Sequence, residues 1–279
     1  MPTLSQRDLV EIERQAVELA TMAGAQITAA LGRTLAVRYK GEADKRKDLR
    51  DPVSEIDEEV EVLIRERVAS FFPGQDVLGE ESEERPGRDH DIIWTIDPID
   101  GTANFVNGFP LFAASIGVLN RGVPVVGAVW CSTSHALRSG VYHARTGGPL
   151  SFESEDFEAV LSPDVRRRLI GLGKGLDAAG LPGDLRRTGS AAIECAFTAA
   201  GLLAATRIET PNIWDVAGGF ALLQAVGASI RVDTGSGWED FKSFTSRAST
   251  YEENDLRHWS GRVIGGTPNV VNALCRRSD

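Results

Sequence analysis

The sequence predicts a layered α+β fold, and three observations lead to that class. Apolar residues recur every three or four positions near the N-terminus, two apolar runs in the middle are separated by a short turn, and the last third holds alanine-rich helical segments followed by strands. Strands in hairpins, with helices grouped elsewhere, favour an α+β arrangement over a sheet of regularly alternating strands and helices.

Two helices are expected before residue 75. The first runs from Ser5 to about Leu31 and ends at Gly32, and its buried face is expected to hold Leu9, Ile12, Ala16, Ala20, Ala23, Ile27 and Ala30. Ser54 is placed to cap the second helix, whose first-turn acids suit the helix dipole. Phe72-Pro73-Gly74 ends that helix, and the charged segment at residues 40–51 is expected to be a solvated loop.

Strands are expected at residues 91–96, 112–119 and 123–130, the last two joined by the hairpin turn Asn120-Arg121-Gly122. The pattern weakens between residues 131 and 188. A glycine and proline turn at 147–149 suggests an N-terminal α+β subdomain, residues 1–147, and a C-terminal α/β subdomain, residues 148–279. In the second subdomain we expect helices at 191–205 and 214–226, and strands at 229–232 and 262–264.

The composition argues against several classes of protein. Lys and Arg number 30 against 40 Asp and Glu, a net charge of −10, and no dense basic run offsets it, so neither nucleic acid nor a membrane surface is an expected partner. The three cysteines lie far apart without a CxxC pair, which suits a reducing compartment rather than a disulfide framework. The first residues lack the apolar core of a signal peptide, so a soluble, cytoplasmic protein is expected.

The densest chemical signal is the segment WTIDPIDGTAN at residues 94–104. A strand ends there in two acids, Asp97 and Asp100, and Pro98 turns the chain sharply between them. Such a turn can direct both carboxylates and the carbonyl of Ile99 toward one point, an oxygen set that suits Mg²⁺. Gly101 would let a phosphate approach the backbone amides that follow. The alternative is a tight turn in which the acids only cap backbone amides.

Acids also gather in three other short segments. Glu80 and Glu81 lie in Gly79-Glu80-Glu81-Ser82, Asp57 lies in the first turn of the second helix, and Asp215 follows Trp214 at the start of a later helix. Taken one at a time, Asp57 and Asp215 are typical of helix caps, and the acids from Glu81 onward of a solvated surface run.

Together these segments resemble a known family. GEES at residues 79–82, WTIDPIDGTANFVNGFP at residues 94–110 and IWDVAGG at residues 213–219, in this order and at this separation, resemble the inositol monophosphatase family of Mg²⁺-dependent, lithium-sensitive phosphomonoesterases. The resemblance implies an αβαβα sandwich with the metal pocket between two subdomains, and a homodimer. It also implies two or three Mg²⁺ ions, for which Mn²⁺ can substitute on ligand grounds.

The resemblance assigns roles to individual residues. The metal ligands would be the carboxylates of Glu80, Asp97, Asp100 and Asp215 and the carbonyl of Ile99. Thr102 and Asp57 would orient and activate the attacking water, with Glu80 as a further catalytic acid. The substrate contacts implied by the family motifs are Gly101, Thr102, Gly189, Ser190, Ala191, Glu209 and Asp215, of which Glu209 would meet substrate hydroxyls.

Some features depart from the family pattern. Ser54 stands where threonine is commoner, and the run after Glu209 is a residue shorter than usual. The strand pairs usual between residues 130 and 189 are hard to find, so we expect the second subdomain's sheet to be shortened or recast.

Three functions remain open on the sequence. The first is hydrolysis of inositol monophosphate or a related sugar-alcohol phosphate, the second is hydrolysis of histidinol phosphate, and the third is an inactive relative that only binds metal. Fructose 1,6-bisphosphate and 3′-phosphoadenosine 5′-phosphate are further substrates of related enzymes. A phosphatase of the haloacid dehalogenase type is disfavoured, because it requires acids spaced DxD and this chain has DxxD.

Overall fold

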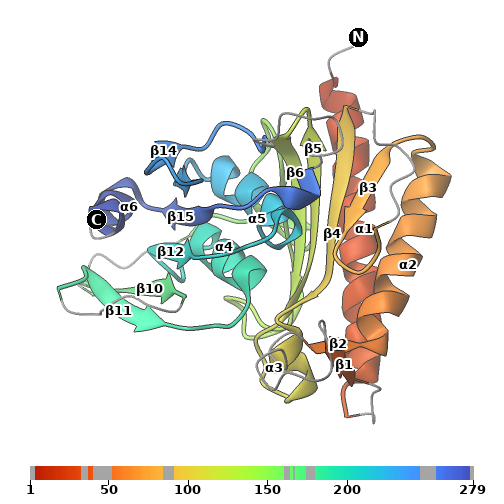
Figure 1. The fold of residues 1–279 in the computed structure, drawn as a ribbon, viewed down its shortest axis with the longest axis horizontal. Coiled ribbons are helices and arrows are strands. Elements are labelled where there is room, and N and C mark those ends of the chain that lie inside the picture. The colour runs from red at the N-terminus through yellow and green to blue at the C-terminus, as the bar shows by residue number, and fades with distance from the viewer. Residues whose placement is uncertain are drawn as a thin grey trace.

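The computed structural model describes residues 4–32, 37–39, 52–83, 91–159, 164–165, 167–173, 180–245 and 256–276, and these form five layers (Figure 1). Helices α1 and α2 cover the outer face of the first sheet, α4 and α5 lie between the two sheets, and α6 covers the second sheet. The helices are α1 (Gln6–Ala30), α2 (Glu55–Phe71), α3 (Thr102–Val106), α4 (Ala191–Ala199), α5 (Ile213–Ala225) and α6 (Pro268–Cys275), with a short 3₁₀ helix η1 (Leu256–His258). The layers confirm the predicted α+β sandwich.

The first sheet has seven strands over the described residues, in the order β3-β4-β5-β6-β7-β8-β9. They are β3 (Asp76–Gly79), β4 (Ile92–Asp100), β5 (Ala113–Asn120), β6 (Val123–Cys131), β7 (Gly140–Arg145), β8 (Ser151–Phe152) and β9 (Glu155–Asp156). Neighbours pair antiparallel except β3 and β4, which are parallel. The predicted division at residue 147 falls inside this sheet, between β7 and β8.

The second sheet has six strands in the described part of the chain, in the order β11-β10-β12-β15-β13-β14. They are β10 (Arg168–Leu172), β11 (Gly183–Arg186), β12 (Ala205–Ile208), β13 (Ser229–Asp233), β14 (Glu239–Asp240) and β15 (Arg262–Gly266). A separate antiparallel pair is formed by β1 (Val37–Tyr39) and β2 (Pro52–Ser54).

The two N-terminal helices and the central hairpin are confirmed. Ser5 and Asp8 form a capping box at the start of α1, and the predicted buried face of this helix is buried. The capping box of α2 pairs Ser54 with Asp57. The turn between β5 and β6 has positive φ at Arg121 (52°) and Gly122 (78°), the conformation that a tight hairpin requires. The segment predicted as a loop at 40–51 lies outside the described residues.

Three local predictions were wrong. The strand predicted to end at residue 96 continues to Asp100, with a register shift between Asp97 and Asp100 where Pro98 interrupts the ladder. The helix predicted at 191–205 ends at Ala199, and β12 begins at Ala205. The region between residues 130 and 189 contains β7 to β11, so strand pairs are present where we expected few.

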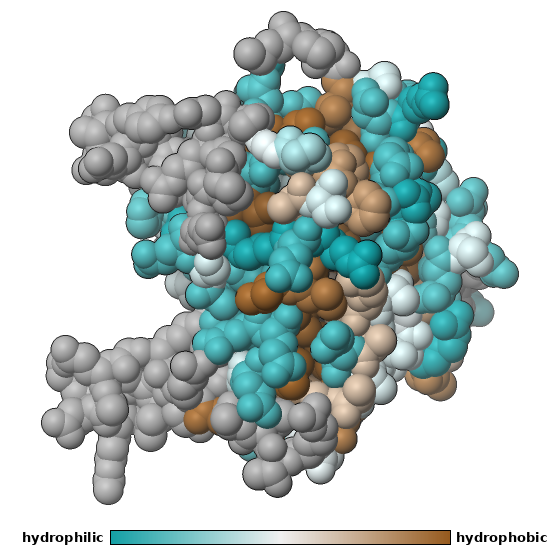
Figure 2. Space-filling view, turned by 90° about the vertical axis from the view of Figure 1, so that its right-hand side faces the viewer, coloured by the Kyte–Doolittle hydropathy of each residue, from teal (hydrophilic) through white to brown (hydrophobic). Residues whose placement is uncertain are grey.

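Three apolar clusters fill the spaces between the layers. One lies under α1 and α2, one surrounds α4 and α5 between the sheets, and one packs α6 onto the second sheet. Figure 2 shows the outer side of the α1 and α2 layer, where hydrophilic side chains surround scattered apolar ones. The large apolar residues exposed on these two helices are Val10, Val62 and Phe71. Among the described residues, no helix combines the length and the apolar character needed to span a membrane.

Glycines allow α5 to approach the first sheet closely. A Cβ placed on Gly127 of β6 would lie 2.1 Å from the carbonyl oxygen of Gly218 in α5. On the neighbouring strand, a Cβ on Gly117 would lie 2.7 Å from the Gly218 nitrogen. The backbones of helix and sheet are therefore in direct contact, and this contact sets where the N-terminus of α5 lies relative to β4.

We predict that Gly127→Ala destabilises the protein by about 1–3 kcal/mol, because the added methyl group must push backbone rather than a flexible side chain. Denaturant unfolding monitored by circular dichroism measures the change. Gly173→Ala is the matched control, since its Cβ would meet nothing closer than 3.6 Å. Equal stability of the two variants would contradict the close contact.

Candidate active site

Three acids from three separate elements meet at one point. Glu80 follows β3, Asp97 lies in β4, and Asp215 lies in the first turn of α5. Each offers a carboxylate oxygen, and these oxygens lie within 4.8 Å of one another. Glu80 and Asp97 approach because β3 and β4 are parallel, with Gly79 opposite Ile96. These three acids, far apart in sequence, therefore lie together in the fold.

The Asp97 carboxylate fits a metal ligand best. Asp97 is 2% exposed, and its Oδ1 atom has no hydrogen-bond partner in the described part of the chain. A buried carboxylate oxygen without a donor is costly unless a cation or proton satisfies it. Three carboxylates form an oxygen-only donor set, which hard cations such as Mg²⁺ or Mn²⁺ prefer. These residues can therefore hold a divalent cation.

The pKa values of the clustered acids also favour a bound cation. Burial, then the charges of Glu80, Asp100 and Asp215, raises the pKa of Asp97 well above its usual value. Burial, with the charges of Asp100 and Glu80, also raises the pKa of Asp215. Like charges in a poorly solvated site disfavour ionisation, and a bound cation removes that penalty.

Asp100 lies beside the cluster and is bound to a different helix. Its Oδ2 atom accepts hydrogen bonds from the Ser190 hydroxyl and from the Ala192 nitrogen, each at 2.5 Å. Burial raises the pKa of Asp100 to about 6, although these hydrogen bonds act in the opposite direction. Asp100 thus joins the end of β4 to the N-terminus of α4. It is not one of the three residues whose oxygens converge.

Thr102 and Asp57 are in contact, as the resemblance predicts. The Thr102 hydroxyl lies 3.1 Å from Asp57 Oδ1 and 2.8 Å from the carbonyl oxygen of Ile99. The other oxygen of Asp57, Oδ2, accepts hydrogen bonds from the Ser54 nitrogen (2.9 Å) and the Ser54 hydroxyl. Burial is the main cause that raises the pKa of Asp57 to about 6. A carboxylate with a pKa near neutrality is suited to accept and release a proton.

The predicted substrate segments come together at Gly101. This residue has φ +87°, and a Cβ placed on it would lie 3.2 Å from the carbonyl oxygen of Gly189 and from the Cβ of Ser190. Ser190 caps α4, whose first residue is Ala191. The structure therefore places the Gly189–Ala191 segment against the start of α3, beside Thr102.

Glu209 does not belong to this contact network. It follows β12, and its carboxylate forms an ion pair with Arg207 at 2.6 Å. Arg207 is 3% exposed. The role of Glu209 toward a substrate stays a prediction.

Two histidines and a surface arginine contact residues outside the acidic cluster. His135 contacts the Tyr142 hydroxyl, and His143 contacts Glu13. Arg167 pairs with Asp184 on the surface. His90 and Arg166 lie outside the described residues.

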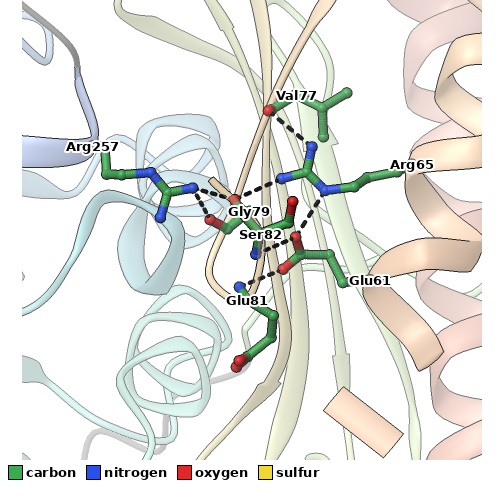
Figure 3. A network of polar contacts seen from close by, with 7 residues as sticks. All are labelled: Glu61, Arg65, Val77, Gly79, Glu81, Ser82 and Arg257. Carbon is green, nitrogen blue, oxygen red and sulfur yellow. Dashed lines mark hydrogen bonds and ion pairs between the residues drawn. The ribbon is translucent and has the colours of Figure 1, made fainter. Parts of the chain in front are cut away.

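Sequence reasoning missed the residues that hold the Glu80 turn. Glu61 and Arg65 of α2 and Arg257 of η1 contact the backbone of Gly79 to Ser82 (Figure 3). The spacing of Glu61 and Arg65, four residues apart on a helix, was a usable signal. Nothing in the sequence around Arg257 predicted its contact with this turn.

The chain is similar to known proteins in both sequence and fold. A family model described as the inositol monophosphatase family matches residues 8–264. An inositol-1-monophosphatase of Mycobacterium leprae is 31% identical, with 98% of this chain and 94% of the relative covered. One of Mycobacterium bovis is 34% identical, with 66% and 69% covered. The crystal structure of the extragenic suppressor protein suhB from Bartonella henselae superimposes with a TM-score of 0.72 at 24% identity, covering 96% of this chain and 98% of that one.

The raised pKa values predict how the metal-free protein responds to pH. An acid whose pKa is higher in the folded state makes folding less favourable as pH rises through that pKa, because the folded protein then loses its extra proton. The pKa values of Asp57 and Asp100, about 6, set the pH range in which stability is lost. The pKa values of Asp97 and Asp215 are also raised, so these two acids likewise lower stability as pH rises. In EDTA we expect a lower melting temperature at pH 7.5 than at pH 5.5.

The Asp215→Asn variant tests the origin of that effect. It removes one charge from the cluster, so its metal-free form should melt about 2–4 °C above wild type at pH 7.5, the shift that about 1 kcal/mol causes in a protein of this size. Its melting temperature should also change less between the two pH values. Asp91→Asn is the control, because Asp91 pairs with Arg121 on the surface. An equal pH response in wild type and Asp215→Asn would show that the cluster is not the cause.

Proposed function

Since the chain belongs to the inositol monophosphatase family and is a phosphoric monoester hydrolase of that kind, we propose that it is Mg²⁺-dependent and hydrolyses inositol monophosphate or a related sugar-alcohol phosphate. The observation that carries the proposal is the convergence of Glu80, Asp97 and Asp215 next to the contact between Thr102 and Asp57. A cation site adjoining a hydroxyl–carboxylate pair is what hydrolysis of an anionic ester by water requires.

The metal would be held by the carboxylates of Glu80, Asp97 and Asp215, with Asp100 and the Ile99 carbonyl next to them. When bound, Mg²⁺ neutralises phosphate charge and lowers the pKa of a water molecule. The residues of the chain hold this position rigidly, since Asp97 lies in β4 and Asp215 accepts a hydrogen bond from the Asn212 nitrogen at the start of α5 (2.8 Å).

Thr102 and Asp57 would handle the proton of the attacking water. The Thr102 hydroxyl has one proton, for which Asp57 Oδ1 (3.1 Å) and the Ile99 carbonyl oxygen (2.8 Å) are the two acceptors, and its lone pairs stay free to accept a hydrogen bond from water. The water proton can then pass to Thr102 as the Thr102 proton passes to Asp57. The two hydrogen bonds from Ser54 to the other oxygen of Asp57 keep this carboxylate in place during the transfer.

The phosphate and the alcohol would be bound by different segments. The backbone amides of Gly101 and Thr102 would donate to phosphate oxygens, and the segment Gly189–Ala191 would line the same pocket. Glu209 would accept hydrogen bonds from substrate hydroxyls. We also propose lithium sensitivity, a homodimer and a cytoplasmic location, because family members commonly show the first two and the composition suits the third.

A phosphate-release assay tests the proposal. The panel holds inositol 1-phosphate, histidinol phosphate, fructose 1,6-bisphosphate and 3′-phosphoadenosine 5′-phosphate, each with Mg²⁺ and with EDTA, and lithium is added to active samples. We expect Mg²⁺-dependent release, fastest from inositol 1-phosphate. Preference for histidinol phosphate would keep the chemistry and replace the substrate. Metal binding without release from any compound would favour an inactive relative.

We predict that Thr102→Ala lowers kcat by about 10²–10⁴-fold, the usual contribution of positioned proton transfer, while metal affinity stays near wild type. Steady-state kinetics give kcat, and calorimetric titration with Mn²⁺ gives the affinity. Thr102→Ser is the matched control because it keeps the hydroxyl and should retain most of the activity. Wild-type turnover in Thr102→Ala would refute the assignment of Thr102.

A further inference from the structure

The turn that carries Glu80 is held by charged side chains that are not metal ligands. The turn begins at Gly79, the last residue of β3, and runs to Ser82. A backbone hydrogen bond runs from the Glu80 nitrogen to the carbonyl oxygen of Ile96 in the neighbouring strand, at 3.2 Å. Beyond that bond, Glu61 and Arg65 contact the turn from one side and Arg257 from the other (Figure 3).

Helix α2 supplies the first side. The Glu61 carboxylate accepts hydrogen bonds from the nitrogens of Glu81 (2.7 Å) and Ser82 (3.0 Å). It is so close beneath Gly79 that a Cβ there would lie 2.3 Å from its Oε1 atom. Arg65 pairs with Glu61 at 2.8 Å and donates to the Ser82 carbonyl at 3.1 Å. These contacts fasten the turn to α2 but not to α5, which carries Asp215.

Arg257 supplies the second side and also contacts α5. One nitrogen of its guanidinium donates to the carbonyl oxygens of Gly79, at 2.7 Å, and of Ser82. The centre of the guanidinium lies 5.3 Å from the ring centroid of Trp214, which immediately precedes Asp215. A single side chain therefore touches both the turn that delivers Glu80 and the helix turn that delivers Asp215.

We propose that Arg257 is a positioning residue of the metal site, setting the separation between Glu80 and Asp215 that a divalent cation requires. The inference rests on the proposed function, because it assumes that these carboxylates bind metal. Arginine suits the task, since its planar group can donate to carbonyls at its edge while one face lies on an aromatic ring. Residues that orient metal ligands typically contribute 10- to 100-fold to metal affinity.

Arg262 offers a matched comparison within the same chain. Its guanidinium lies 5.3 Å from the Trp238 ring centroid, like that of Arg257 from Trp214, but its oxygen partner is the Asp233 carboxylate instead of backbone carbonyls. Neither Trp238 nor Asp233 adjoins a proposed metal ligand in sequence. Loss of Arg262 should cost stability without changing the distance between the metal-binding carboxylates.

Calorimetric titration of the full-length protein with Mn²⁺ and Mg²⁺, after removal of metal with EDTA, tests the proposal without any substrate. We expect Arg257→Ala to raise the Kd for Mn²⁺ by about 10- to 100-fold. Arg262→Ala should leave the Kd for Mn²⁺ unchanged. It should lower the melting temperature of the metal-free protein at least as much as Arg257→Ala does. The Kd of Arg257→Lys should lie between those of wild type and Arg257→Ala, because an ammonium group can still donate to a carbonyl of the turn.

Two results would overturn the role of Arg257. One is a Kd in Arg257→Ala within twofold of wild type, and the other is an equal loss of affinity in Arg262→Ala. If Arg257→Ala does not fold, Arg257→Lys decides: unchanged affinity refutes the role and weaker binding supports it. Wild-type protein that binds metal but releases no phosphate contradicts the proposed function alone. Wild-type protein with no metal affinity contradicts both.

Discussion

The mutual repulsion of carboxylates that are wholly or partly buried is the constraint on which the site depends. Glu80, Asp97 and Asp215 converge within 4.8 Å, and Asp100 lies near enough to raise the pKa of two of them. Such a group separates unless the fold holds each acid independently. The parallel strands β3 and β4 hold Glu80 and Asp97, and the capping box of α5 holds Asp215. Asp100 accepts a hydrogen bond from the first turn of α4, and the nearby Asp57 belongs to the capping box of α2. The positive ends of three helix dipoles thus face the acidic centre and offset part of its charge.

This arrangement reconciles two roles that the sequence predicts for the same acids. Taken singly, Asp57 and Asp215 were typical of helix caps, and by resemblance they were functional acids. In the structure each of them belongs to a capping box, and each also takes part in the contacts that are proposed to be functional. Asp57 uses Oδ2 to cap α2 and keeps Oδ1 for Thr102, and Asp215 accepts from the Asn212 nitrogen while contributing an oxygen to the cluster. A capping acid is a good ligand because the cap has already fixed its position.

The parts of the fold that were predicted are those encoded over short stretches of chain. The capped helices α1 and α2, the β5–β6 hairpin and the acidic segments each carry their signal within about one element. The errors have physical causes. β8 and β9 are two residues long and show no periodicity, and the run after Ala199 stays rich in apolar residues although it forms the buried strand β12. The contact between Asp100 and Ser190, and that between Arg257 and Gly79, join distant segments and follow only from the complete fold.

The electrostatics also bear on how an alcohol is selected. A protein of net charge −10 with an acidic centre repels a phosphate ester, and any further acid facing the substrate would add to that repulsion. Glu209, proposed to meet the hydroxyls, is paired with the nearly fully buried Arg207, which itself lies over Trp238. The ion pair cancels most of the field of Glu209 at a distance but leaves carboxylate lone pairs to accept from hydroxyl groups at close range. On the proposed role of Glu209, selection of the alcohol would be separated from attraction of the phosphate, and that separation would depend on Arg207 rather than on a metal ligand.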